Sequence, residues 1–276
     1  MGSNFDELVS KFIKTRKEGL SPLTLKFYKA YLTRAQSVVG LNVQGIDISL
    51  FLKSRQCANG GKHAYFRTLR TFYNWLYSRK SGYRLNPQDN PIQYVDIPKK
   101  EKRILPSVTE TQLEHLLAQA DSLRDKCIIQ LLFDSGMRLS EITKVKRNDI
   151  DWANHTITII GKGNKQRRAP FTQNTAEMLQ IYLGDNHATG TIWGLTTYGI
   201  ETILKRLGDK TGIKCNPHSF RRGFACNLHK KGLSTLDIMH LGGWEDLSMV
   251  LNYTRSITFD DCLKHYREIE VTHFLR

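Results

Sequence analysis

Apolar residues recur at helical spacing through most of the chain. Around residues 5–13, 21–35 and 62–78 they stand three or four positions apart, which predicts amphipathic helices. Ser21 and Pro22 mark the start of the second helix, because serine caps helices and proline fits their first position. The third segment interleaves aromatic with basic residues, and we expect its aromatic side chains to form a core.

A polar, basic segment bounded by two prolines, Pro98 to Pro106, interrupts this pattern and predicts a linker. Beyond it, Thr109 to Gln112 offers a helix cap, and an apolar helix is expected from Asp125 to Leu139. Residues 155–160 and 167–170 flank a Gly-Lys-Gly-Asn-Lys turn and predict a β-hairpin.

The predicted fold class is therefore mainly α with a small β-hairpin or sheet, the α+β part lying in the second half. We expect a helical domain over 1–97, a linker over 98–106 and a second domain over 107–276. Apolar residues at Phe259 and Tyr266 predict a C-terminal tail helix, which could pack on its own domain.

The composition and net charge of the chain limit which kinds of binding partner and cellular compartment it suits. The chain has 276 residues, 40% of them hydrophobic, which is enough for two domains with real cores. A formal net charge of +15 suits a polyanion such as nucleic acid, although a solvated basic surface is the alternative. The chain has five cysteines, an odd number, and no two of them form a CxxC pair. This argues against a disulfide framework or a zinc site and favours a reducing cytoplasm. No apolar run is long enough to cross a bilayer, so we expect no membrane association.

The second half also contains the basic and aromatic groups that phosphoryl transfer would need. Guanidinium groups can hold the nonbridging oxygens of a phosphodiester bidentately. We hypothesise a metal-free site with its own tyrosine nucleophile. The candidate residues are Arg138, Glu141, Lys162, Lys165, His218, Arg221, Arg222, Trp244 and Tyr253.

These residues stand in segments that resemble the motif boxes of the tyrosine recombinases, the family of phage integrases and Xer proteins. Ser135–Ile142 is similar to the first arginine box and Ile160–Lys165 to the lysine hairpin. His218–Arg221 is similar to the His-x-x-Arg box, and Trp244 with Tyr253 nine positions later to the last box. The boxes follow the family order, and the first hundred residues resemble its helical, SAM-like core-binding domain more loosely.

The resemblance implies that Arg138 and Arg221 clamp the scissile phosphate. Glu141, three positions after Arg138, is expected on the same helical face, where it orients the arginines. An Asn-Pro pair predicts a helix start that places His218 and Arg221 on the first turn, where free amides attract phosphate. His218 matches the residue that shares a proton with the attacking oxygen. Arg222 is expected to contact a DNA phosphate or solvent instead.

The remaining candidates supply the acid and the nucleophile. Lys162 matches the family's general acid for the leaving 5′ oxygen, and Lys165 is a competing candidate. Tyr253 matches the nucleophile, singled out among eleven tyrosines by its spacing from Trp244. Many family members have histidine where Trp244 stands. Because indole has one N–H and cannot shuttle a proton, we expect Trp244 to donate a hydrogen bond to the phosphate and to pack the site.

The implied function is site-specific DNA recombination, for integration, excision or resolution, through a 3′-phosphotyrosine intermediate. The two domains would form a C-shaped clamp around double-stranded DNA at inverted-repeat half-sites. A monomer in solution would assemble into a homo-tetramer on paired sites, with the tail helix docked on the next protomer. Lys62, Arg67 and Arg70 are candidate DNA contacts in the first domain.

No cofactor or metal is expected, because the sequence has neither a Gly-x-x-x-x-Gly-Lys-Ser/Thr loop nor carboxylates spaced for two metals. The protein is expected in the cytoplasm, associated with the nucleoid when bound to DNA. Two alternatives stay open at this point. One is a type IB topoisomerase, which uses similar chemistry to relax supercoils, and the other is a catalytically silent DNA-binding regulator.

Overall fold

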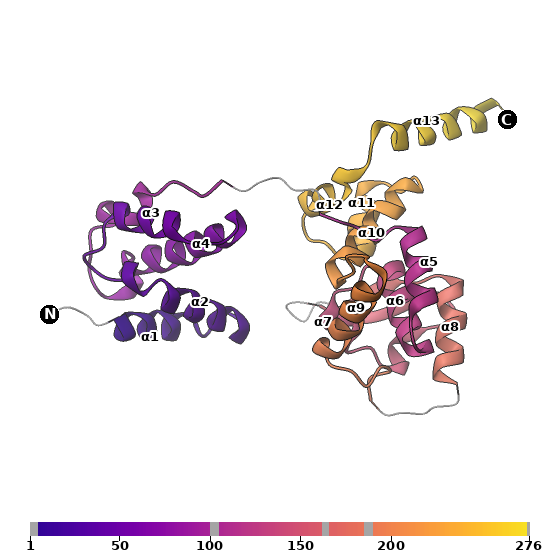
Figure 1. Cartoon of the computed structure of the whole chain (residues 1–276), viewed down its shortest axis with the longest axis horizontal. Helices are drawn as coiled ribbons and strands as arrows, with labels where there is room; N and C mark the ends of the chain where they lie inside the picture. Colours follow the sequence, from indigo (N-terminus) through magenta and orange to yellow (C-terminus); the bar gives the residue numbers. More distant parts are fainter. Residues whose placement is uncertain (1–4, 100–104, 162–165, 185–189, 275–276) are drawn as a thin grey trace. The chain divides into compact units, whose positions relative to one another are not determined.

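The chain divides into two compact units, residues 1–103 and 104–276 (Figure 1). The computed structural model describes residues 5–99, 105–161, 166–184 and 190–274. The predicted domain limits, 1–97 and 107–276 with a linker between them, stay predictions. None of the helices in the described residues is long and apolar enough to span a membrane.

The first unit is helical. Ser21 caps its second helix by accepting a hydrogen bond from the Thr24 backbone N–H, and Pro22 opens that helix as predicted. Phe12 packs edge-to-face on Phe72 and Trp75, so the aromatic residues form the core as expected. The helices are α1 (Phe5–Arg16), α2 (Pro22–Arg34), α3 (Gly45–Ser54) and α4 (Asn59–Leu76).

The second unit combines helices with a small antiparallel sheet of order β1-β2-β3. The predicted hairpin is confirmed as β2 and β3, whereas the two-residue strand β1 was not predicted. Its elements are α5 (Glu110–Gln119), α6 (Leu123–Ser135), α7 (Leu139–Ile142), β1 (Ile150–Asp151), β2 (Thr156–Ile160), β3 (Gln166–Pro170), α8 (Gln173–Leu183), α9 (Thr197–Thr211), α10 (Pro217–Lys230), α11 (Thr235–Gly242), α12 (Leu247–Tyr253) and α13 (Phe259–Phe274). The predicted fold class, mainly α with a small sheet, is confirmed.

Helix α6 forms the centre of the second unit and packs against α8 and α10. The prediction that this helix continues to Leu139 is wrong, because it ends at Ser135. Gly136 takes the left-handed conformation with φ of 55°, and a side chain there would lie 2.6 Å from the Phe224 ring. The chain therefore turns at Gly136, and Arg138 leaves the core and reaches the site described below.

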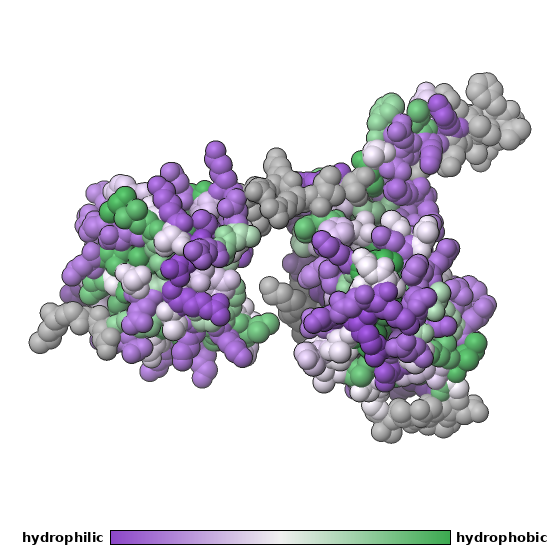
Figure 2. Space-filling model, viewed as in Figure 1, coloured by the Kyte–Doolittle hydropathy of each residue, from purple (hydrophilic) through white to green (hydrophobic). Residues whose placement is uncertain are grey.

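Helix α13 begins with exposed apolar side chains. Phe259 is 77% exposed and Tyr266 is 59% exposed, so most of each side chain is open to solvent. Figure 2 shows hydrophobic surface, in green, where α13 leaves the rest of the unit. An ion pair of 3.1 Å between Lys230 and Asp261 ties the start of α13 to α10.

Candidate active site

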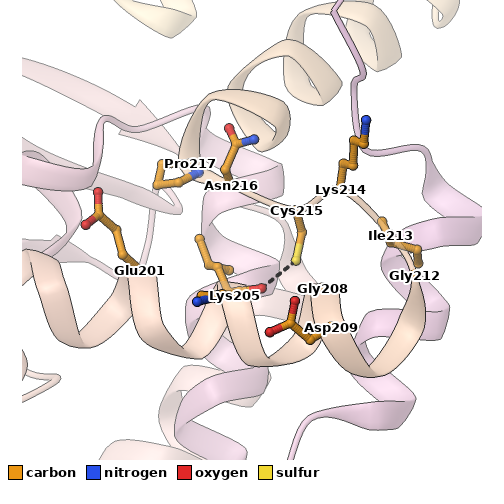
Figure 3. Close-up of a pocket in the computed structure, with 11 residues that line it drawn as sticks. Glu201, Lys205, Gly208, Asp209, Gly212, Ile213, Lys214, Cys215, Asn216 and Pro217 are labelled. Carbon is orange, nitrogen blue, oxygen red and sulfur yellow. Dashed lines mark hydrogen bonds between the residues drawn. The ribbon is translucent and has the colours of Figure 1, made fainter.

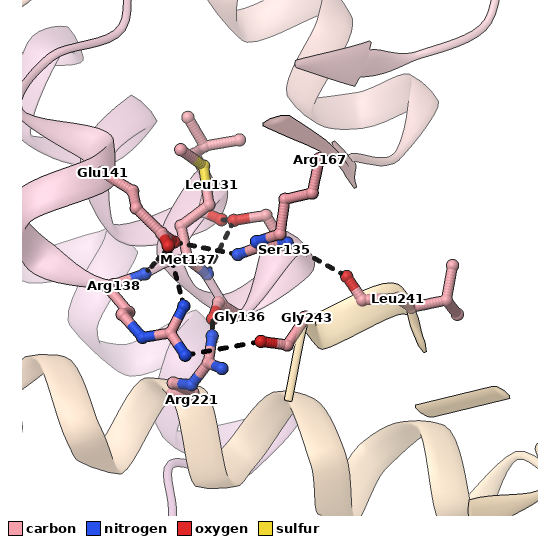
Figure 4. Close-up of polar contacts among 10 residues, drawn as sticks. All are labelled: Leu131, Ser135, Gly136, Met137, Arg138, Glu141, Arg167, Arg221, Leu241 and Gly243. Carbon is pink, nitrogen blue, oxygen red and sulfur yellow. Dashed lines mark hydrogen bonds and ion pairs between the residues drawn. The ribbon is translucent and has the colours of Figure 1, made fainter. Parts of the chain in front are cut away.

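Arg138 is the N-cap of α7, not a residue of a continuing helix. Its backbone N–H donates to Glu141 Oε2 and its Nη1 to Glu141 Oε1, both at 2.8 Å. Its Nη2 donates to the Gly243 carbonyl at 3.3 Å (Figure 4). The predicted pairing of Arg138 with Glu141 is therefore present, but it arises because the Glu141 carboxylate reaches back from the first turn of α7 to the N-cap residue, not because the two share a helical face.

Glu141 is a buried carboxylate at the centre of this cluster. Burial alone raises its pKa, but the hydrogen bond from the Arg138 backbone and the charges of Arg167 and Arg138 outweigh burial and lower the pKa. Glu141 is therefore ionised at neutral pH and balances part of the positive charge around it.

Arg167 is a site residue that the sequence prediction missed. Its Nη2 donates to Glu141 Oε2 at 2.8 Å and its Nη1 to the Leu241 carbonyl at 3.3 Å (Figure 4). In the sheet Arg167 pairs with Ile159, which is buried. An arginine at an inward-facing strand position was the signal available in the sequence, since neighbouring strand residues point to opposite faces.

Arg221 enters the cluster from α10. Asn216 caps this helix by accepting from the Ser219 backbone N–H at 3.0 Å, which confirms the predicted start. His218 lies on the first turn, whereas Arg221 lies on the second. Arg221 is only 3% exposed, and its Nη1 donates to the Gly136 carbonyl.

The positive charges in the cluster oppose one another. Burial, followed by the charges of Arg138 and Arg167, lowers the pKa of Arg221 to about 9. Arg221 stays protonated at neutral pH, yet its cation is held at a cost in free energy. An anion bound here would relieve that cost, which makes the cluster a ready site for a phosphate.

Trp244 lies between Arg221 and Tyr253. The Arg221 guanidinium carbon is 4.1 Å from the centre of the Trp244 ring, and the ring centroids of Trp244 and Tyr253 are 5.6 Å apart. Within the described residues, Trp244 Nε1 and Arg221 Nη2 are buried and have no hydrogen-bond partner. Buried donors are normally paired, so this pair of N–H groups is suited to a ligand oxygen.

Tyr253 is the last residue of α12 and is half-buried. Its ring packs against the cluster of Phe224, Ile238, Trp244 and others, and its carbonyl accepts from Cys226 Sγ at 3.1 Å. The structure thus brings Arg138, Arg221, Trp244 and Tyr253 into one region of the second unit.

His218 opens to solvent beside this region. Partial desolvation, followed by the charges of Arg222, Arg221 and Arg138, lowers the pKa of His218. The imidazole is therefore neutral at neutral pH and can accept a proton.

The expectation that Arg222 faces solvent or a phosphate is corrected by the structure. Arg222 is 7% exposed, and its Nε donates to the Pro106 carbonyl at 2.7 Å. The residue thereby anchors the start of the second unit to α10. Sequence periodicity missed this because the partner lies 116 positions away.

The remaining predicted residues are not assigned to this cluster. Lys162 and Lys165 fall outside the described residues. In the first unit Arg67 and Arg70 are exposed and line a hollow of about 590 Å³ on α2 and α4. Lys62 does not line it, and its ammonium donates to the Lys53 carbonyl at 3.3 Å.

A further hollow of about 430 Å³ opens at the end of α9 (Figure 3). Its lining includes Lys205, Lys214 and Cys215, whose Sγ donates to the Leu204 carbonyl at 2.8 Å. No residue of the arginine cluster lines it. We therefore take the cluster, not this hollow, as the candidate active site.

Comparison with known proteins identifies the family of the chain. A model of the phage integrase family matches residues 106–258. Tyrosine recombinase XerC of Bacillus subtilis is 32% identical over 211 residues, which are 67% of this chain and 67% of that protein. XerC of Oceanobacillus iheyensis is 28% identical over 284 residues, which are 91% of this chain and 90% of that protein.

A solved structure shows the same fold. The crystal structure of a lambda integrase dimer bound to a COC′ core site aligns with a TM-score of 0.76 at 15% identity. The alignment covers 94% of this chain and 97% of that one.

Fold and site together define a tyrosine-type recombinase. The chain belongs to the phage integrase family. Its function is site-specific recombination, and neither the topoisomerase nor the regulator alternative is favoured.

Proposed function

We propose that the chain cuts and rejoins double-stranded DNA through a covalent bond between Tyr253 and a 3′ phosphate. The observation that carries this proposal is the pair of buried, unpartnered donors, Arg221 Nη2 and Trp244 Nε1, next to the Tyr253 ring. Donors arranged in advance stabilise charge that develops during a reaction without reorganising. A pentacoordinate phosphorane carries such charge on its nonbridging oxygens.

In the proposed first step, the Tyr253 hydroxyl oxygen attacks phosphorus and the bond from phosphorus to the 5′ oxygen breaks. His218 accepts the phenolic proton, because its lowered pKa leaves the imidazole neutral and available as a base. Lys162 gives a proton to the leaving 5′ oxygen. A 5′-hydroxyl of a partner strand then attacks the phosphotyrosine, the proton transfers reverse, and Tyr253 is released with the strand rejoined.

Arg138 and Arg221 hold the nonbridging oxygens in this proposal, and Trp244 adds a third donor. Glu141 sets the orientation of Arg138 through its backbone and its guanidinium. Loss of one such donor costs about 2.7–4 kcal/mol of transition-state stabilisation in comparable sites.

The wider assembly belongs to the same proposal. The net charge of +15 and the exposed Arg67 and Arg70 suit contact with a DNA backbone. Inverted-repeat half-sites would place two protomers on one duplex. Pairing of two such duplexes would then bring four protomers together as a tetramer. The exposed apolar side chains of Phe259 and Tyr266 support docking of the tail on a neighbouring protomer, with a monomer before DNA binding.

Covalent adduct formation tests the proposal. A duplex site is first selected from a random pool by the Tyr253→Phe chain, and a nicked form then traps the adduct on a denaturing gel. The wild type should form the adduct and Tyr253→Phe should not. Tyr198→Phe, at a residue that is 76% exposed on α9, is the matched control and should react as the wild type does. An adduct that persists in Tyr253→Phe would assign the nucleophile to another residue.

A further inference from the structure

We infer that Arg167 is a positioning residue for the phosphate clamp. In this role its guanidinium joins Glu141 to the C-terminal end of α11, at 241–243, and so keeps Trp244 and Arg221 in place. The inference rests on the proposed function, because it concerns how that clamp keeps its geometry.

The first support is a bridge between distant parts of the chain. Arg167 Nη2 donates to Glu141 Oε2 at 2.8 Å, while Nη1 donates to the Leu241 carbonyl at 3.3 Å. Figure 4 shows Arg167 reaching from β3 between these two acceptors. One planar guanidinium therefore spans the first arginine box and the end of α11, a task for which a lysine ammonium has the wrong shape.

The second support is the close approach of backbone to the Arg167 stem. A Cβ at Gly243 would lie 2.4 Å from Arg167 Cδ and 2.5 Å from its Nε. Gly243 has φ of 62°, which favours glycine in its own right. Trp244 is the residue after Gly243, and the Arg221 guanidinium stacks on its ring. Movement of the Arg167 side chain would thus shift the C-terminal end of α11 and the donors that follow it.

The third support is the shared carboxylate. Glu141 Oε2 accepts from both the Arg138 backbone N–H and Arg167 Nη2, each at 2.8 Å. Because Glu141 is buried, removal of Arg167 leaves the carboxylate with Arg138 as its remaining ion-pair partner in the cluster. The angle at which Arg138 faces a phosphate would change as a result.

Arg167 has the features of a residue that acts through others and does not touch substrate. Its side chain is 16% exposed, and both terminal nitrogens are engaged with protein acceptors. The unpartnered nitrogen of Arg167 is Nε, which lies against Gly243, whereas in Arg221 it is the terminal Nη2 that is buried without a partner in the described residues. The terminal nitrogens of Arg138 are also engaged, but its side chain is 40% exposed and so open to a ligand. Direct contact with a phosphate is therefore assigned to Arg221 and Arg138, and support of both to Arg167.

The test compares Arg167→Ala and Arg167→Lys with Arg168→Ala. Arg168 is the next residue of β3 and is exposed, so its replacement controls for loss of one positive charge on the same strand. Affinity for the selected duplex and the single-turnover rate of adduct formation are measured below the unfolding temperature. A second duplex has a neutral methylphosphonate at the scissile position.

We expect both Arg167 variants to form adduct about 10²-fold more slowly, the effect of a misplacement of about 1 Å. Their affinity for the duplex should match that of Arg168→Ala, and the methylphosphonate should not restore the rate. An Arg167→Ala rate equal to that of Arg168→Ala overturns the inference. Restoration on the methylphosphonate duplex also overturns it, because the arginine would then neutralise the phosphate directly.

Failure of the positioning role can be distinguished from failure of the proposed function. Equal losses of folding, affinity and rate in both Arg167 variants would reduce Arg167 to a stabilising residue and overturn the positioning role. A wild-type chain without any adduct would overturn the proposed function and the inference together. A reactive wild type with unaffected Arg167 variants would overturn the inference alone.

Discussion

Replacement of Arg221 by methionine should stabilise the folded chain while it slows cleavage. The buried cation has its pKa lowered from the ordinary 12.5 to about 9. At about 1.4 kcal/mol for each pH unit, the charge costs the folded state roughly 5 kcal/mol. Because the folded pKa is the lower one, the full cost applies below about pH 9, which includes neutral pH.

Part of this gain in stability is offset, because methionine cannot make two contacts that the Arg221 guanidinium makes. The bond to the Gly136 carbonyl is lost, which costs about 1–3 kcal/mol when an acceptor stays buried. The contact of the guanidinium with the Trp244 ring contributes about 0.5–2 kcal/mol. The net expectation is a gain of about 2 kcal/mol in unfolding free energy, with adduct formation about 10²–10³-fold slower.

Urea unfolding and the adduct assay, run on the same preparations, check this pair of effects. Arg168→Met is the control, since this exposed side chain lies outside the cluster and should change neither quantity much. A less stable Arg221→Met chain that still cleaves at the wild-type rate would refute the account of Arg221 as a costly, functional cation.

The other predictions concern proton transfer. Lys162→Ala should cleave slowly on a normal duplex but recover when sulfur replaces the bridging 5′ oxygen, because a thiolate leaves without protonation. Arg138→Ala should not recover on that duplex, and recovery of both or of neither would remove Lys162 from the role of acid. The rate of adduct formation should fall as pH drops through the lowered pKa of His218, since the neutral imidazole is the base. His218→Gln should flatten that limb of the pH profile, and an unchanged limb would assign the base elsewhere. Stability should also fall below the ordinary histidine pKa, where the unfolded chain binds the proton more readily than the folded one.

Local signals in the sequence predicted the elements that depend on neighbouring residues. Ser21 before Pro22, the Thr109–Gln112 box and Asn216 before Pro217 each begin a helix as expected. Caps of this kind satisfy backbone groups within one turn, so a short stretch of sequence contains all the information.

The errors arose where the outcome depends on distant contacts. The helix α6 stops at Ser135 because Gly136 faces the Phe224 ring, and that contact joins segments nearly ninety positions apart. Arg222 was expected outside and is buried on the Pro106 carbonyl, while Arg167 was not recognised as part of the site. From the sequence alone, a charged arginine is expected on the surface. A buried carbonyl or carboxylate can hold an arginine inside the protein, but such a partner is brought to it only in the folded chain.

Mass spectrometry of the digested adduct tests the central claim most directly. The wild-type chain is trapped on the selected nicked duplex, then treated with nuclease and protease. We predict that the peptide with Tyr253 carries a nucleotide joined through its 3′ phosphate. A nucleotide on any other residue, or one joined through a 5′ phosphate, would contradict the account.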